Sequence, residues 1–156
     1  MGFLIRPARD ADREALLAQT LGLNRFEHAI AGDRRTDEEG ARETLDHVLG
    51  RIADSQGHAV VAEADGAVVG HLFLTFGQHL PFVAEREHGY VADLFVRESH
   101  RGHGIGRALL AEAERLTKAR GLKRLLIGVL AGNDGAEATY KRFGFAHYAH
   151  EMIKKI

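Results

Sequence analysis

The sequence predicts an α/β fold: a mixed, mostly antiparallel sheet flanked by about four helices. Two observations support it. Apolar runs at 59–62 and 68–74 flank Asp65-Gly66, a dipeptide typical of the tight turn between antiparallel strands. Further on, an apolar strand at 90–96, an amphipathic helical pattern and an apolar strand at 125–130 follow one another, which is the order of a parallel crossover.

The first third of the chain predicts one strand and two helices. The strand covers 3–6 and stops at a proline, because the residue before a proline disfavours helical backbone. A helix capped by Asp10 or Asp12 follows, and the segment 22–35 shows no clear pattern. A second helix begins after 36–39, whose Thr-Asp-Glu-Glu sequence is typical of a capping box.

The second half predicts a strand, loop, helix, strand, helix and final strand. The loop at 97–104 is polar and rich in glycine, and the helix after it ends near Gly121. Asn133 is placed to cap a short helix that Gly144 can end. A last strand is predicted at 146–153.

Composition narrows the classes of protein. The 156 residues fit a single domain over 1–156, and the formal charge of −1 gives no basic field for nucleic acid or anionic lipid. The absence of cysteine excludes disulfides, zinc-thiolate sites and a cysteine nucleophile, and it suits a reducing, cytoplasmic location. No long apolar run predicts a membrane span. The ten histidines show no metal-binding spacing, so we expect scattered surface histidines and no metal.

The segment with the most chemical information is the glycine-bearing loop 101–107, which lies at a predicted helix start. Such a start presents unpaired N–H groups and a partial positive charge, and glycines let a phosphate approach closely. A plain turn into a helix is the structural alternative. Two nucleotide motifs fail: Gly106 is not followed by Lys and Ser or Thr, and Arg107 stands where a dinucleotide fingerprint needs glycine.

Two motifs at matching separation resemble the GCN5-related N-acetyltransferase (GNAT) superfamily. Arg-Gly-His-Gly-Ile-Gly at 101–106 is similar to its acetyl-CoA motif, and 133–145 is similar to its second signature. The strand 90–96 most resembles that of diamine and thialysine-type acetyltransferases, but Ala92 replaces their glutamate. That departure removes a candidate base or amine-binding carboxylate.

The resemblance implies that 90–96 and 125–130 form a central parallel strand pair that splays apart around acetyl-CoA, the expected co-substrate. Backbone groups of one strand would pair with the pantetheine arm, and amides of the glycine loop would hold the pyrophosphate. The implied cofactor-binding residues are Leu94, Phe95, Val96, Arg101, Gly102, His103, Gly104, Ile105, Gly106, Arg107, Asn133, Ala136 and Tyr140.

The reaction needs a proton donor for the departing thiolate and a route for the proton of the amine. By the resemblance, Tyr140 matches the sulfur-protonating position; without it, Tyr140 is a core aromatic. Asp93 is the first candidate for helping the amine lose its proton; Glu27, an ordered water, or direct binding of the deprotonated amine are the alternatives. Strand alternation places Asp93 between Val91 and Phe95 on one face, where it needs a partner or a function. A structural ion pair is an equal alternative for it.

These residues predict transfer of an acetyl group from acetyl-CoA to a primary amine, a small molecule rather than a protein. Phe26, Glu27 and Asp93 are the candidate acceptor-site residues, the first two by position only. The alternative is a coenzyme A-binding module without catalysis on the same fold. Similar proteins are often dimers, so a homodimer is possible.

Overall fold

The computed structural model describes residues 2–156, which contain one five-stranded sheet in the order β1-β2-β3-β4-β5. Neighbouring strands are antiparallel except for the parallel pair β4–β5, as the sequence predicts. The strands are β1 (Leu4–Pro7), β2 (His58–Ala64), β3 (Ala67–Gln78), β4 (Glu87–Val96) and β5 (Leu125–Ile127).

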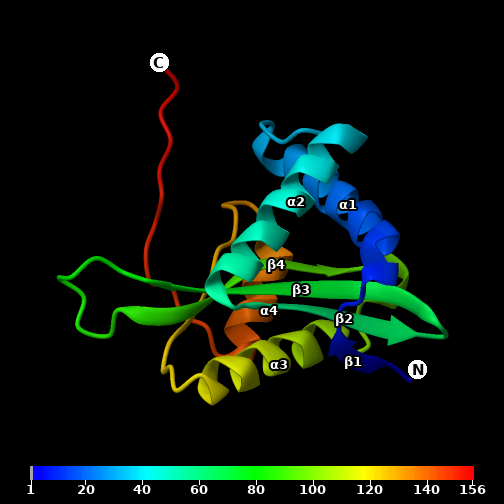
Figure 1. Ribbon diagram of the computed structural model, residues 1–156. Coiled ribbons are helices and arrows are strands. Elements are labelled where there is room, and N and C mark those ends of the chain that lie inside the picture. Colours follow the sequence, from blue (N-terminus) through cyan, green and yellow to red (C-terminus); the bar gives the residue numbers. More distant parts are fainter. Residues whose placement is uncertain (1) are drawn as a thin grey trace.

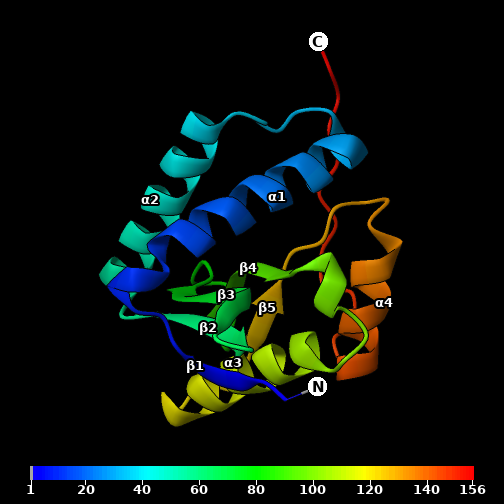
Figure 2. The ribbon, with the colours of Figure 1, turned by 90° about the vertical axis from the view of Figure 1, so that its right-hand side faces the viewer.

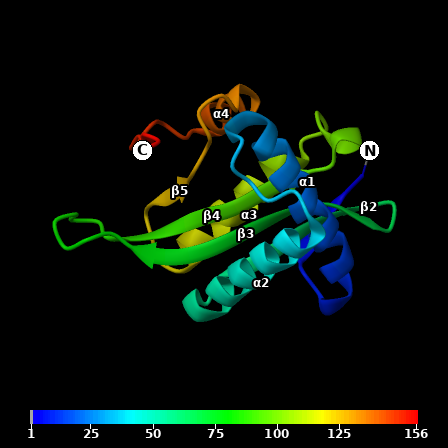
Figure 3. The same cartoon turned by 90° about the horizontal axis from the view of Figure 1, so that it is seen from above.

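Helices cover both faces of this sheet (Figures 1 and 2). Helices α1 and α2 pack on one face, α3 packs on the other, and α4 contacts α3. Seen from above, α1 and α2 both cross over β3 (Figure 3). The helices are α1 (Arg13–Ala31), α2 (Glu38–Ser55), α3 (Ile105–Ala119) and α4 (Asp134–Phe143), with single 3-10 turns at Asp10–Asp12 and Glu98–His100.

Most local signals in the sequence act as expected. Asp65 and Gly66 both have positive φ, 52° and 74°, and connect β2 to β3. The segment 22–35, which shows no clear sequence pattern, is mostly helical, because α1 continues to Ala31. The predicted capping box before α2 is wrong, because Asp37 is the N-cap and makes no side-chain cap bond. Its carboxylate instead accepts hydrogen bonds from the guanidinium of Arg35, at 3.1 and 3.3 Å.

Strand β4 contains a β-bulge that changes the predicted orientation of its side chains. Phe73 of β3 lies opposite Asp93, and the next residue, Leu74, lies opposite Val91, so Ala92 has no partner in β3. The bulge shifts the alternation of the strand by one residue. Val91 therefore packs in the cluster formed with α3, whereas Asp93 faces the side covered by α1, and the prediction that both share one face is wrong.

The C-terminal part differs most from the prediction. The last parallel strand is shorter than expected and ends at Ile127 instead of 130. The predicted strand at 146–153 is not formed: this segment extends away from the sheet with Met152 and Ile153 exposed (Figure 1). A segment forms a strand only where a neighbouring strand exchanges backbone hydrogen bonds with it.

The start of the chain is fastened to the sheet by a buried ion pair. The guanidinium of Arg6 in β1 donates to both carboxylate oxygens of Asp12, at 2.8 and 3.0 Å, and to Glu63 of β2 at 2.6 Å. The side chains of Arg6 and Asp12 are only 10% and 8% exposed. The hydrogen bond from Arg6 is the main reason why the pKa of Asp12 lies below its ordinary value. This cluster sets where α1 leaves the sheet.

We predict that Asp12→Asn lowers the free energy of unfolding by about 3 kcal/mol, because it leaves a buried guanidinium short of its counter-charge. The pKa of Asp12 is lowered in the folded state, so its stabilisation is present above its unfolded pKa of about 4 and disappears as the pH falls. Urea unfolding should therefore show a gap between wild type and variant that narrows below about pH 4.

The matched control is Asp46→Asn, which removes a pair with Arg13 whose side chains are 45% and 56% exposed. Its cost should stay below about 1 kcal/mol. Equal costs for the two substitutions would contradict the structural role of the Arg6–Asp12 pair.

Candidate functional site

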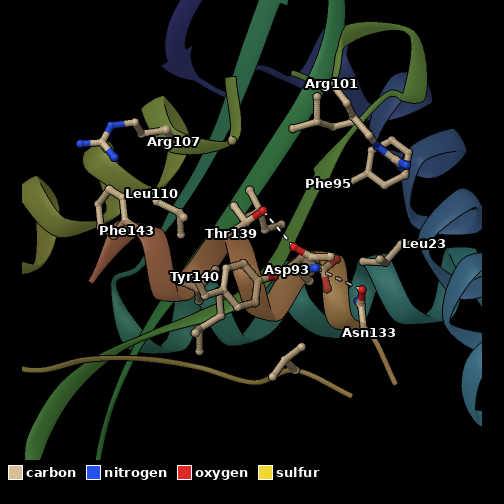
Figure 4. A pocket seen from close by; sticks show the side chains of 18 of the residues that line it. Leu23, Asp93, Phe95, Arg101, Arg107, Leu110, Asn133, Thr139, Tyr140 and Phe143 are labelled. Atoms are coloured by element: carbon tan, nitrogen blue, oxygen red, sulfur yellow. Dashed lines mark hydrogen bonds between the residues drawn. The ribbon is translucent and has the colours of Figure 1, made fainter. Parts of the chain in front are cut away.

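A cavity of about 620 Å³ opens where β4 and β5 diverge. Their parallel pairing is limited to three positions and ends at Val91 opposite Ile127. Beyond this point β4 runs on to Val96 along β3, while β5 stops and the chain turns away through 128–132. The size is within the usual range for a small-molecule site. Its walls come from α1, β4, α3, α4 and the segment after β5 (Figure 4).

One end of the cavity is the N-terminus of α3. Gly104 is the N-cap of this helix with φ of 85°, and Gly102 has φ of 78°. Both conformations are unfavourable for residues with a Cβ, and both glycines have open space where a Cβ would lie. The first amides of α3 therefore face the cavity with no side chain at these two positions in front of them, an arrangement that favours an anionic group.

Two arginines flank this end. The Nε of Arg101 donates to the carbonyl of Val96 at 2.9 Å, and its guanidinium lies 6.0 Å from the ring of Phe26. Arg107 lies 5.8 Å over the ring of Phe143. Both side chains line the cavity, and Figure 4 shows them on opposite sides of it. Positive charge thus adds to the partial charge of the helix end.

Tyr140 of α4 lines the middle of the cavity and packs against the core formed with α3. Burial, and then the negative charges of Glu27 and Asp93, raise the pKa of Tyr140 to about 12. The phenol therefore stays protonated at neutral pH. A neutral phenol in this place can donate a proton or a hydrogen bond.

The acidic residues of the cavity lie on the side of α1. Asp93 and Glu27 both line it, from β4 and α1, together with Phe26. The pKa of the Glu27 carboxyl lies above its ordinary value, mainly because of burial. The charge of Arg34 opposes this shift, and the charge of Asp93 adds to it. Two carboxyl groups and a buried phenol therefore converge on one region, which suits a cationic partner.

Asp93 has a partner that sequence reasoning missed. Its Oδ2 lies 3.5 Å from Nε2 of His71, a fully buried side chain of β3. The expectation of scattered surface histidines is wrong for His71 and for His88, which is 8% exposed. The position of His71 inside the apolar run 68–74 is the signal that could have identified a buried histidine.

The helix after β5 is capped as predicted. The side chain of Asn133 accepts a hydrogen bond from the amide of Ala136 at 3.4 Å, and both residues line the cavity. Thr139 and Arg142 also line it, and no motif in the sequence singles them out. Capping by Asn133 sets the start of α4 and, seven residues later, the place of Tyr140.

The structure brings nearly all of the predicted site residues to this one cavity: Phe26, Glu27, Asp93, Leu94, Phe95, Val96, Arg101, Gly102, Gly104, Ile105, Gly106, Arg107, Asn133, Ala136 and Tyr140. His103 is the exception. Its ring is exposed and lies 3.4 Å from the carbonyl of His100, because the positive φ of the glycines on either side turns the loop.

The described residues 2–156 contain neither a cluster of metal ligands nor a helix that could span a membrane. No group of three or more His, Asp or Glu side chains there has an arrangement that could hold a metal ion. Within the same residues, no helix has both the length and the apolar surface that crossing a membrane requires.

A glycine-bearing helix start, a diverging parallel strand pair and a tyrosine on the next helix are the features that the resemblance to the GNAT superfamily implies. Comparison with known families agrees with this geometry. The model of the Acetyltransferase (GNAT) family matches residues 23–145, and the chain belongs to that family. The more specific likeness to diamine and thialysine acetyltransferases has no support from these comparisons.

Individual proteins similar to this chain share about a third of its residues or fewer. Streptothricin acetyltransferase from Streptomyces lavendulae is 31% identical over 109 residues, which are 70% of this chain and 54% of that protein, so the match spans about half of the relative. The structure of a mutant of the BH1408 protein from Bacillus halodurans has a TM-score of 0.85 at 22% identity, covering 98% of this chain and 99% of that one. A predicted acetyltransferase from Clostridium acetobutylicum, solved with acetyl-CoA, has a TM-score of 0.75 at 17% identity, covering 99% and 96%.

The protonation of Tyr140 gives a direct test of the site's electrostatics. With its pKa at about 12, Tyr140 stays neutral up to about pH 11, where ordinary tyrosines have ionised. We expect the tyrosinate absorbance that develops up to that pH to be the same in wild type and in Tyr140→Phe.

The control is the same titration in denaturant, where the variant should lose the contribution of one of the three tyrosines of the chain. If Tyr140→Phe lost that contribution in the folded protein too, the burial of this phenol would be contradicted.

Proposed function

We propose that this chain is an N-acetyltransferase that moves the acetyl group of acetyl-CoA to a primary amine, with a small-molecule amine as acceptor. The observation that carries the proposal is the cavity itself. It joins an anion-favouring helix end to a region with two carboxyl groups and a neutral phenol. Those two ends match the two ends of the reaction, a pyrophosphate-bearing co-substrate and a cationic amine.

Coenzyme A fits the residues present. Beyond Val91 the side of β4 that faces β5 has no paired strand, so backbone groups of Leu94, Phe95 and Val96 are positioned to bind the pantetheine arm as an added strand would. The amides from Gly102 to Arg107 would hold the pyrophosphate. When bound, the thioester supplies the acetyl group and a thiolate leaving group.

Tyr140 would supply the proton that the leaving thiolate takes up. Attack of the amine on the carbonyl carbon forms the C–N bond and an oxyanion, and collapse of that intermediate breaks the C–S bond. A phenol held neutral by burial keeps its proton available until the thiolate develops. Asn133 and Ala136 set the start of the helix that carries it.

Asp93 and Glu27 would bind the amine and help it lose a proton. Ala92 offers no carboxylate, and Asp93 is the next residue in β4. The relative named for streptothricin, a small molecule, supports a small-molecule acceptor in general but selects none. The rival function, a coenzyme A-binding module without catalysis, shares the helix end and does not need Tyr140.

Three further predictions concern the whole protein. We propose that residues 1–156 form a single domain, that the protein is cytoplasmic, and that it forms a homodimer, as similar proteins often do. Light scattering of the purified chain checks the homodimer.

We predict that Gly104→Glu weakens coenzyme A binding about tenfold or more, because a carboxylate at the start of α3 occupies the anion position and strains backbone at φ of 85°. Calorimetric titration measures the affinity. The matched control is Gly121→Glu, a glycine with φ of 81°, open space around it and a position away from the cavity. Equal affinities for the two variants would remove the pyrophosphate assignment.

We predict that Tyr140→Phe lowers kcat about a hundredfold and leaves coenzyme A affinity unchanged. A thiol-release assay with polyamines, aminoglycosides, amino acids and peptide N-termini measures turnover and identifies the acceptor class. Tyr148→Phe, at a side chain that is 60% exposed and outside the cavity, is the control. Tight coenzyme A binding with no turnover on any amine would favour the binding module.

A further inference from the structure

His71 is a fully buried histidine whose two ring nitrogens face two different elements. Its Nδ1 lies 2.8 Å from Oε1 of Gln19 in α1, and its Nε2 lies 3.5 Å from Oδ2 of Asp93 in β4. The ring stacks between Phe73 and Phe95, with centroids 4.5 and 6.0 Å away. Burial and stacking hold the ring in one orientation.

The neighbouring amide determines which nitrogen carries a proton. Gln19 is 2% exposed, and its Nε2 donates to the carbonyl of Val68 at 3.0 Å. The amide oxygen must therefore point at His71, and an oxygen can only accept. Consequently Nδ1 of His71 is the N–H donor of that bond.

This assignment leaves two acceptors facing each other. In a neutral imidazole with the proton on Nδ1, Nε2 has only a lone pair. It faces a carboxylate oxygen, which also has only lone pairs, and among residues 2–156 the buried Nε2 has no hydrogen-bond partner. One additional proton removes the conflict, because it can sit on either Nε2 or Oδ2 and bond to the other.

The surroundings favour that additional proton. Three titratable groups face Asp93 of β4: His71 of β3, Glu27 of α1 and Tyr140 of α4. Glu27 is acidic, Tyr140 is neutral at physiological pH, and the guanidinium of Arg34 pairs with Glu27 at 3.8 Å. Within residues 2–156, the polar side chains that the ring nitrogens of His71 face are Asp93 and the neutral Gln19.

We infer that His71 and Asp93 form one proton-holding unit at the acceptor end of the cavity, in which Asp93 contacts the amine and His71 is the positioning residue behind it. The inference rests on the proposed function for its role in turnover. The arrangement supplies what Ala92 lacks: a carboxylate, here with a second proton-accepting group, Nε2 of His71, behind it. Its cavity side is Asp93, which is 18% exposed, and its core side is closed.

The proton transfer balances in charge and atoms. An ammonium acceptor gives one proton to the Asp93–His71 unit, which changes from a net charge of −1 to zero, and becomes a neutral amine. The amine nitrogen then attacks the thioester carbon and forms the C–N bond. When the C–S bond breaks, Tyr140 gives its proton to the sulfur, and the nitrogen loses its second proton to the tyrosinate, which restores Tyr140. Release of the held proton to water returns the unit to its starting state.

Nuclear magnetic resonance of the free protein tests the unit without any acceptor. Ring nitrogen spectra of ¹⁵N-histidine-labelled protein, recorded across neutral pH, show which nitrogen of His71 is protonated. Its signal is assigned by its absence in His71→Gln or, if that variant does not fold, by contacts of the ring to Phe73 and Phe95. We expect a proton on Nδ1, because the oxygen of Gln19 faces it, and an Nε2 signal that changes in Asp93→Asn, because the group facing Nε2 is replaced.

The matched control is Glu27→Gln, which removes another carboxylate of the cavity that does not touch His71. It should leave the Nε2 signal of His71 at its wild-type position. A neutral ring with its proton on Nε2, or an Nε2 signal that is the same in wild type and Asp93→Asn, would overturn the inference.

Turnover gives the second measurement, for any amine of the panel that reacts. In His71→Gln, the amide can donate to Asp93 but cannot share a proton, so kcat should fall about tenfold or more. The acid limb of the pH profile should shift to lower pH, and the affinity for coenzyme A should stay unchanged. An unshifted acid limb would contradict the unit. If no amine reacts but the ring-nitrogen spectra of His71 show the expected result, the proton-holding unit stands and the proposed function fails.

Discussion

The bulge at Ala92 is the constraint on which the site depends. It lies directly after the last residue of β4 that pairs with β5, so the strand bends and twists where the parallel pair ends. The divergence that follows opens the cavity. The same extra residue moves Asp93 from the α3 side to the α1 side, where His71 lies. A regular strand in its place would bury this carboxylate among apolar side chains of α3.

The cavity is electrostatically divided because its two ends are made by different kinds of group. Backbone amides, Arg101 and Arg107 make the α3 end positive, and this charge belongs mainly to the fold of the backbone. Side-chain carboxyls of Glu27 and Asp93 make the other end negative. Tyr140 lies between them and stays neutral because burial and both acids oppose its ionisation. Such a division orients a co-substrate that is anionic at one end.

Helix α1 connects stability to the site. Its start is fixed by the buried pair of Arg6 with Asp12, its middle contributes Gln19 against His71, and its later turns contribute Phe26 and Glu27 to the cavity. One rigid element therefore carries both the polar support behind Asp93 and the wall in front of it. A displacement of α1 on the sheet would alter both together, so the ion pair at its start bears on the geometry of the site.

The sequence by itself determined the parts of this protein that depend on neighbours along the chain. Contiguous signals predicted the glycine loop, the turn at Asp65, the cap at Asn133 and the place of Tyr140. The family resemblance rests on the glycine loop and on the segment that holds Asn133 and Tyr140. Tertiary structure alone decided the bulge at Ala92, the pairing of Asp93 with His71 and the absence of a strand at 146–153. The physical reason is that these features depend on hydrogen-bond partners from other strands and helices, which the local sequence does not identify.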